Sequence, residues 1–363
     1  GEPGGDASAV KLDVYAAGVQ DIGQNQNVDQ LDVTVVEHAD VTVPTILTAA
    51  IDYTEPAELV VTCSETIDSS PASLVDPALF TLAQSADSTE VVLTGATVQS
   101  ADGKTVTLTL KEQQRVDAIA LSATPGGDGG AIRLHVSAGA FHDIGLNDLE
   151  ATSDRDVAET EDSKAPVVAS SAVDYSTGVL TITADEYIDC GEFDDADQID
   201  LAKILIIDES GGGGGIDLVG GTVVEVDGKT LTVTLTEKDR VAAIAISSTP
   251  GGDDNGAVVL DISEGAFHDI GLNDVAETLD VAVAETLDNV LPTILNASLD
   301  YNTAVLSVRA SETIDMSPDT EVLLSSFYLS DASGERTIVL TGGEVNTEDG
   351  VTFSITITEA NRV

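Results

Sequence analysis

Acidic side chains recur at fixed places in this chain, and their oxygens are of the kind that bind metal ions. Residues 140–148 read AFHDIGLND, residues 266–274 repeat the same nine letters, and residues 18–26 carry a weaker copy, GVQDIGQNQ. Calcium takes about six to eight oxygen ligands from carboxylates, amides and carbonyls, usually supplied by turns. The D-I-G-L-N-D segment offers several such oxygens within a few residues, so we predict calcium as a cofactor.

The predicted ligands combine this turn with the acidic linker that follows it. If two repeats meet end to end, the linker acids and the turn of the preceding repeat would share ions and stiffen the joint. An alternative is that Asp and Asn only build the turn through Asx hydrogen bonds, while the linker acids are solvated. Further recurring carboxylates are Glu65 and Glu186. The predicted ligands are Asp143, Asn147, Asp148, Glu159 and Asp162, then Asp269, Asn273, Asp274, Glu285 and Asp288.

The same repetition argues against catalysis. His142 and His268 occupy equivalent places in the turn, but Gln20 stands there in the first copy. An active site needs one constellation of residues and not one copy per repeat, and neither G-x-S-x-G nor H-E-x-x-H occurs. We therefore predict that the protein is not an enzyme. The recurring arginines Arg115, Arg240 and Arg362 are expected to form structural ion pairs or to donate to carbonyls.

Alignment on the repeated turns divides the chain into four parts. Residues 41–162 and 163–288 form two complete repeats, while residues 1–40 match the end of a repeat and residues 289–363 match its beginning. A repeat of this length is a whole domain. The two terminal parts together fall only a few residues short of one more repeat. Either the chain is a window cut from a longer array, or neighbouring subunits complete one domain between them and assemble head to tail.

Within each repeat the pattern is that of short β-strands. Runs such as VTLTLKE, LTVTLTE and FSITITE alternate apolar residues with threonine, and Asp-Gly pairs mark turns between strands. Before Arg240, Thr236 is expected to cap a single helical turn in an otherwise short polar segment. Many short strands per repeat predict an all-β chain of tandem immunoglobulin-like β-sandwich domains.

Composition limits the partners. The formal net charge is −51, yet 42% of residues are hydrophobic, so the chain can build cores. Nucleic acid is excluded because binding it requires a clustered Lys/Arg surface. No apolar run approaches ~18 residues, so no membrane span is expected.

The acidity suits a salty or calcium-rich extracellular medium, or it serves solubility alone. Asn296-Ala297-Ser298 is a sequon for glycans, although chance explains one occurrence.

Two motifs carry a resemblance to a known family. S-E-T-I-D or its variant follows an alternating strand at 63–68, 184–189 and 310–315, and G-A-F-x-D-x-x-G comes later in each complete repeat. These motifs resemble bacterial and archaeal surface-layer-associated immunoglobulin-like repeats, across essentially the whole chain. A departure is that Cys63, Ala184 and Ala310 replace the Phe expected before the motif.

The resemblance implies a structural cell-surface protein: a repeat array of an S-layer or extracellular filament that self-associates into a homopolymer or lattice. The alternative is a stalk of a large secreted adhesin whose binding domain lies outside these residues.

Overall fold

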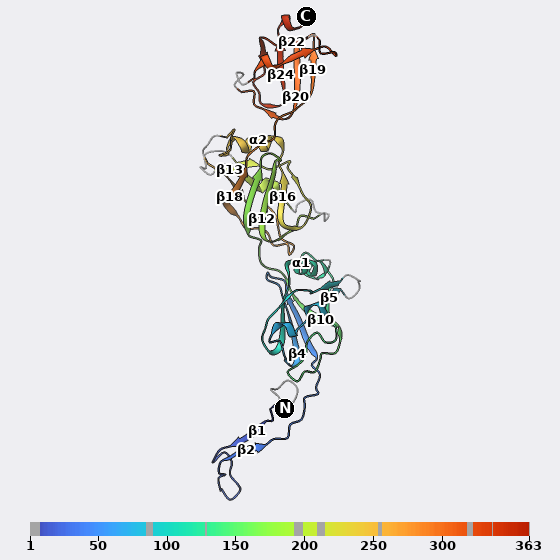
Figure 1. Ribbon diagram of the computed structural model, residues 1–363, viewed down its shortest axis with the longest axis vertical. Helices are drawn as coiled ribbons and strands as arrows, with labels where there is room; N and C mark the ends of the chain where they lie inside the picture. The colour runs from blue at the N-terminus through green and yellow to red at the C-terminus, as the bar shows by residue number, and fades with distance from the viewer. Residues whose placement is uncertain are drawn as a thin grey trace.

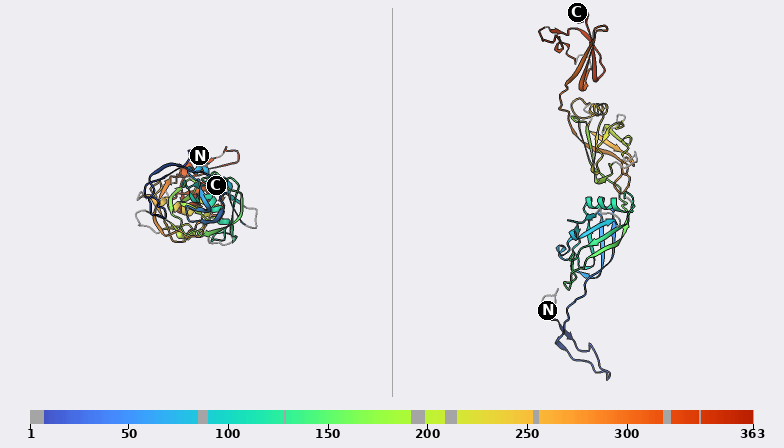
Figure 2. Two further views of the ribbon diagram at one scale, coloured as in Figure 1. Left: turned by 90° about the horizontal axis from the view of Figure 1, so that it is seen from below. Right: turned by 90° about the vertical axis from the view of Figure 1, so that its right-hand side faces the viewer.

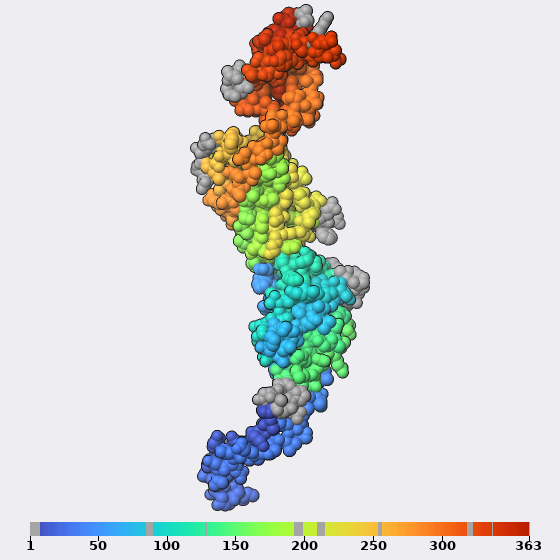
Figure 3. All heavy atoms as spheres, viewed as in Figure 1, coloured from blue at the N-terminus to red at the C-terminus, as the bar shows by residue number. Residues whose placement is uncertain are grey.

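The computed structural model describes residues 8–84, 90–127, 129–191, 199–208, 215–252, 256–317, 322–335 and 337–362. We call residues 41–162 unit 1, residues 163–288 unit 2 and residues 289–363 unit 3. After an N-terminal hairpin, the three units follow one another along the long axis of the molecule (Figures 1 and 3). Seen along that axis, the molecule has a narrow outline (Figure 2). The chain is therefore mostly β-structure arranged as a column.

Unit 1 contains one eight-stranded sheet in the order β6-β5-β9-β10-β3-β4-β8-β7. Alternating Val, Ile, Leu and Thr place one face of each strand in the core, as in β4, where buried and partly exposed residues alternate. The strands are β3 (Ile46–Asp52), β4 (Glu58–Ile67), β5 (Phe80–Gln84), β6 (Glu90–Val92), β7 (Thr97–Val98), β8 (Gly103–Thr109), β9 (Ile132–Val136) and β10 (Thr152–Thr160). Two 3₁₀ turns, Ala72–Leu74 and Pro77–Leu79, precede β5.

Strand β10 joins the two halves of this sheet. Its first part pairs antiparallel with β9, and its last four residues, from Val157, pair in parallel with β3. The sheet curls so that its halves enclose one core, because Leu59 of β4, Leu82 of β5 and Leu134 of β9 belong to the same buried cluster. Two layers facing one core agree with the β-rich class expected from the sequence.

Unit 2 repeats this arrangement strand for strand, in the order β14-β13-β17-β18-β11-β12-β16-β15. A 3₁₀ turn, Leu201–Lys203, precedes β13. Strand β18 again pairs antiparallel with one neighbour, β17, and in parallel with the other, β11. The strands are β11 (Val168–Asp174), β12 (Val179–Ile188), β13 (Ile204–Asp208), β14 (Ile216–Asp217), β15 (Thr222–Val223), β16 (Gly228–Thr234), β17 (Val258–Ile262) and β18 (Thr278–Thr286).

Each of these two units also contains an α-helix at the end that faces the next unit (Figure 1). Helix α1 spans Glu112–Leu121 and helix α2 spans Glu237–Ala245. The sequence predicts a single helical turn before Arg240, and both helices are longer than that. Thr236 does cap α2, by accepting a hydrogen bond from the Asp239 amide, but the helix continues because buried residues such as Ala243 anchor it to the unit.

Unit 3 and the N-terminal hairpin contain fewer strands. Unit 3 has a four-stranded sheet, β19-β20-β24-β23, and a pair, β21-β22. The hairpin consists of β1 (Lys11–Val14) paired antiparallel with β2 (Gln30–Thr34). The elements of unit 3 are β19 (Ile294–Asp300), β20 (Val305–Ile314), a 3₁₀ turn (Leu324–Ser326), β21 (Tyr328–Ser330), β22 (Thr337–Val339), β23 (Gly343–Val345), β24 (Gly350–Ile357) and α3 (Glu359–Arg362). Among the residues described, no helix is both long and apolar enough to cross a membrane.

Candidate functional site at the joint between units 1 and 2

Arg115 forms the centre of the joint between units 1 and 2. It lies on α1 of unit 1, and its side chain is 1% exposed. The guanidinium donates to Asp162 in the linker and, over 3.2 Å from Nη2, to Glu186 Oε2 on β12 of unit 2. It also pairs with Glu112, one helical turn away, at 2.7 Å. One buried cation thus ties together unit 1, the linker and unit 2, as a structural ion pair of the kind expected from the sequence.

Two further polar contacts cross the same joint. Lys164 Nζ lies 3.0 Å from Glu55 of unit 1 and 2.7 Å from Asp185 of unit 2. Glu112, in turn, accepts a hydrogen bond of 3.2 Å from the Tyr187 amide. These bonds therefore connect the two units through separate segments.

An apolar contact completes the joint. Ile270, from the second AFHDIGLND turn, belongs to unit 2 in sequence but packs in the buried core cluster of unit 1. Gly126 makes this approach possible, since a Cβ at that position would lie 1.8 Å from the Ile270 carbonyl oxygen. Its φ of +84° also favours glycine.

The acids at this joint form a compact cluster. Carboxylate oxygens of Asp162, Glu186 and Asp269 lie within 4.8 Å of one another, and all three residues are buried. Asn273 donates two hydrogen bonds to Asp269: its backbone amide to Oδ1 over 2.9 Å and its side-chain Nδ2 to Oδ2 over 3.0 Å. These are the Asx hydrogen bonds of the turn that the alternative explanation predicts.

Burial sets the electrostatics of the cluster. Burial, reinforced by the nearby charges of Asp269 and Asp162, raises the pKa of Glu186 to about 8, against the lowering effect of Arg115. Burial also raises the pKa of Asp269, although the hydrogen bonds from Asn273 oppose this. Keeping all three carboxylates ionised at this place would therefore require positive charge beyond that of Arg115 and of Lys164, whose Nζ lies 3.9 Å from Glu186 Oε1.

An equivalent cluster lies at the other end of unit 1. It consists of Asp40, Glu65 and Asp143, which occupy the same places in their repeat as Asp162, Glu186 and Asp269. Asn147 donates hydrogen bonds of 2.9 Å to Asp143 from both its backbone amide and its side-chain Nδ2.

The joint between units 2 and 3 reproduces the ion pairs of the first joint. Arg240 Nη1 lies 2.7 Å from Asp288, Nη2 lies 3.6 Å from Glu312, and Nε lies 2.8 Å from Glu237. Glu237 accepts a hydrogen bond of 2.7 Å from the Thr313 amide, as Glu112 does from Tyr187.

The structure divides the ten predicted ligands among four environments. Asp143, Asp162 and Asp269 lie in the clusters, and Asn147 and Asn273 support them. Asp148 and Asp274 lie on the exposed side of the turns. Glu159 and Glu285 lie apart, within their own units, where they accept hydrogen bonds from the hydroxyls of Tyr53 and Tyr175. Asp288 pairs with Arg240.

The expected sharing between linker acids and the turn of the preceding repeat differs from what the structure shows. Asp162 meets Asp269, in the turn of the following unit, and not Asp143. Strand β10 explains this, because its nine residues separate the first turn from Asp162 by roughly 30 Å at about 3.3 Å per residue. Each turn instead lies beside the S-E-T-I-D segment of its own unit, as the bridge between Ile67 and Asp143 shows.

The ligand set predicted from the sequence lacks Glu65 and Glu186, although both recur at equivalent positions. The signal that identifies them is their place at the end of a buried strand, next to the linker in space. Ser64, adjacent to Glu65, donates its amide hydrogen to Thr45 just after the linker, over 2.9 Å.

No protein-family model matches the chain, and no curated protein matches it. Among solved structures, it resembles the N-terminal part of the bacterial S-layer protein SbsC, with 12% identity and a TM-score of 0.24 over 54% of this chain and 44% of that one. A longer SbsC structure, residues 31–844, gives 16% identity and a TM-score of 0.24 over 82% of this chain and 31% of that one. Three fibronectin domains of chicken CNTN1 give 10% identity and a TM-score of 0.22, covering 86% of this chain and 87% of that one.

The chain spans less than half the length of these two SbsC structures. At such identities and TM-scores the resemblance does not by itself assign a function.

Proposed function

We propose that this chain is a structural array of immunoglobulin-like domains at the cell surface, built to keep its units in line. The observation that carries the proposal is the closed joint around Arg115, whose partners come from unit 1, the linker and unit 2. Linkers between independent domains are usually exposed and make few contacts across the boundary. A buried ion-pair network at the boundary supports a mechanical role in which the relative orientation of the units matters.

The same features favour an extracellular S-layer or filament. The net charge of −51 is tolerated best where dissolved cations screen repulsion. The S-E-T-I-D and G-A-F-x-D motifs point to surface-layer-associated repeats. Calcium is the cofactor we propose for the acidic joints, because their donors are oxygens. An adhesin stalk would share the stiff column but would not need to associate with itself.

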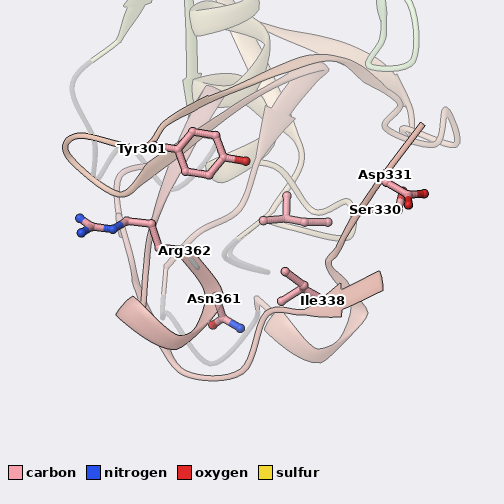
Figure 4. Close-up of a pocket in the computed structure, with 7 residues that line it drawn as sticks. Tyr301, Ser330, Asp331, Ile338, Asn361 and Arg362 are labelled. Carbon is pink, nitrogen blue, oxygen red and sulfur yellow. The ribbon is translucent and has the colours of Figure 1, made fainter. Parts of the chain in front are cut away.

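Self-association has a candidate surface on unit 3. Ile294 of β19 is 58% exposed, whereas Ile46, its counterpart on β3, is 2% exposed. Tyr301 is exposed and lines a pocket with Ile338 and Asn361 (Figure 4). In unit 1 the counterpart of Tyr301 is buried Tyr53, and strand β10 pairs with β3 on this side.

The N-terminal hairpin has the sequence that would cover this surface. By repeat position, Leu12 of β1 corresponds to buried Leu134 of β9, and Glu37 corresponds to Glu159, the partner of Tyr53. We therefore propose that the hairpin of a second copy packs against β19, with Glu37 accepting from the Tyr301 hydroxyl. Repeated, this contact is head to tail and forms a linear polymer.

Light scattering on the full chain after size exclusion tests this proposal. We expect the mass to rise with protein concentration, and Leu12→Asp to abolish the rise because a charge would enter an apolar interface. Val219→Asp, at an exposed position of unit 2, is the matched control and should associate as the wild type does. A wild-type chain that stays monomeric at all concentrations would rule out the hairpin contact.

A further inference from the structure

The cluster at the first joint contains more negative charge than its neighbours balance. Asp162, Glu186 and Asp269 contribute three buried carboxylates within 4.8 Å of one another. Arg115 is shared with Glu112. Lys164 lies 3.9 Å from Glu186 but closer to Glu55 and Asp185. Burying unbalanced charge is costly unless a proton or a cation joins it.

One carboxylate oxygen of the cluster has no hydrogen-bond donor. Glu186 is 0% exposed. Arg115 donates to its Oε2, while its Oε1 is buried, accepts no hydrogen bond among the residues described and lies 3.9 Å from Lys164 Nζ. Glu65 Oε1 and Glu312 Oε1 are also buried without a donor, but both residues are partly exposed. A fully buried residue with an acceptor that lacks a donor, as in Glu186, indicates a missing partner.

Glycines bring the turn against the linker at both clusters. A Cβ at Gly271 would lie 2.7 Å from the Cβ of Asp162, and a Cβ at Gly145 would lie 2.9 Å from the Cβ of Asp40. Any side chain there would push the turn away from the linker carboxylate. The two clusters are thus assembled in the same way from three separate segments.

We propose that Asp162, Glu186 and Asp269 bind one divalent cation of the calcium class. This inference rests on the proposed structural function and specifies how its joints are fixed. The donors are all oxygens, which hard cations such as calcium prefer, and the clusters offer no thiolate or imidazole of the kind that selects zinc or copper.

The cation and Arg115 have complementary tasks at the first joint. The ion connects the linker, through Asp162, to β12 and the turn of unit 2. Arg115 connects the same linker carboxylate to α1 of unit 1. Binding of the ion therefore fixes the linker against unit 2, and the arginine transmits this constraint to unit 1.

Calcium titration of the full chain by isothermal calorimetry, in chelator-treated buffer, tests the site. We expect one site with a dissociation constant of about 10⁻⁴–10⁻³ M, the range of extracellular modules. Glu186→Gln should weaken this site at least tenfold. The controls Asp274→Asn and Glu285→Gln should leave it unchanged, since these carboxylates lie outside the cluster.

Thermal unfolding provides a second measurement. Glu186→Gln keeps the shape of the side chain and an oxygen that can accept from Arg115, so the calcium-free variant should melt close to wild type, while the rise in Tm on adding calcium becomes smaller. An intact site and a full Tm rise in this variant would overturn the assignment, as would diffuse binding that no single substitution alters. If the chain failed to associate or to hold its units in line while these titrations came out as expected, the array proposal would fail and the cation site would stand.

Discussion

At the scale of the residue, Arg115 connects the separate parts of the first joint. It is almost fully buried and is paired with Glu112, Asp162 and Glu186. Such a network is weak evidence for net stability, because desolvation offsets much of the attraction. Removal of one partner is different, since it leaves the opposite charges buried and uncompensated.

Replacing Arg115 should therefore be costly. We expect Arg115→Met to lower the free energy of unfolding by about 3–5 kcal/mol, the usual cost of breaking a buried pair. The matched control is Arg133→Met, which breaks a pair with exposed Asp154 and Asp156 and should cost less than about 1 kcal/mol. Chemical denaturation followed by far-UV circular dichroism measures both. Similar losses in the two variants would mean that the joint contributes nothing beyond surface pairing.

At the scale of the element, the strands were predictable and the helices were not. Alternation of Thr with Val, Ile and Leu identifies β8, β16 and β24, because one face of each packs on the core. Helices α1 and α2 lack an equally clear pattern, since each covers the end of a unit and its polar residues, Arg115 and Arg240, are themselves buried. The sequence repeat shows only that these positions recur and cannot show that they face another unit.

The candidate site shows the same limit. The turn acids Asp143 and Asp269 could be identified as candidates from the repeat alone. Their partners could not, because Glu65 and Glu186 approach them only through the bridge that places the turn beside its own S-E-T-I-D segment. Nothing in the linear order indicates that Asp162 meets the turn ahead of it rather than the one behind.

We expect the stability of the second joint to fall in acid, because it depends on the ionised carboxyl of Glu237 on helix α2. Burial acts to raise the pKa of Glu237, but hydrogen bonds from Arg240 and Thr313 outweigh it, so this pKa lies below its usual 4.5. A lowered pKa in the folded state stabilises the protein above pH 4.5, and this contribution is lost as the pH falls through the folded value.

We expect Glu237→Gln to flatten this acid response. Thermal melts between pH 3 and about pH 6 should show a smaller loss of Tm on acidification than in wild type. Glu264→Gln, at an exposed position of unit 2, is the control and should keep the wild-type slope. An unchanged slope in Glu237→Gln would show that this contact does not link stability to pH.

At the scale of the whole molecule, we propose that built joints hold the units in line. The first joint contains Arg115, the buried Ile270 and the three-carboxylate cluster. Its stiffness should depend on Arg115, because this side chain connects α1 of unit 1 to the linker and to unit 2.

Pulsed electron–electron double resonance measures this dependence. Spin labels at exposed Thr48 of unit 1 and Thr222 of unit 2 would be placed in the chain with Arg115 and in Arg115→Met, with buried Cys63 and Cys190 replaced by alanine. We expect one narrow distance distribution across the first joint in the chain with Arg115 and a broader one in Arg115→Met. Distributions of the same width in the two chains would contradict the proposal that this joint holds the units in line.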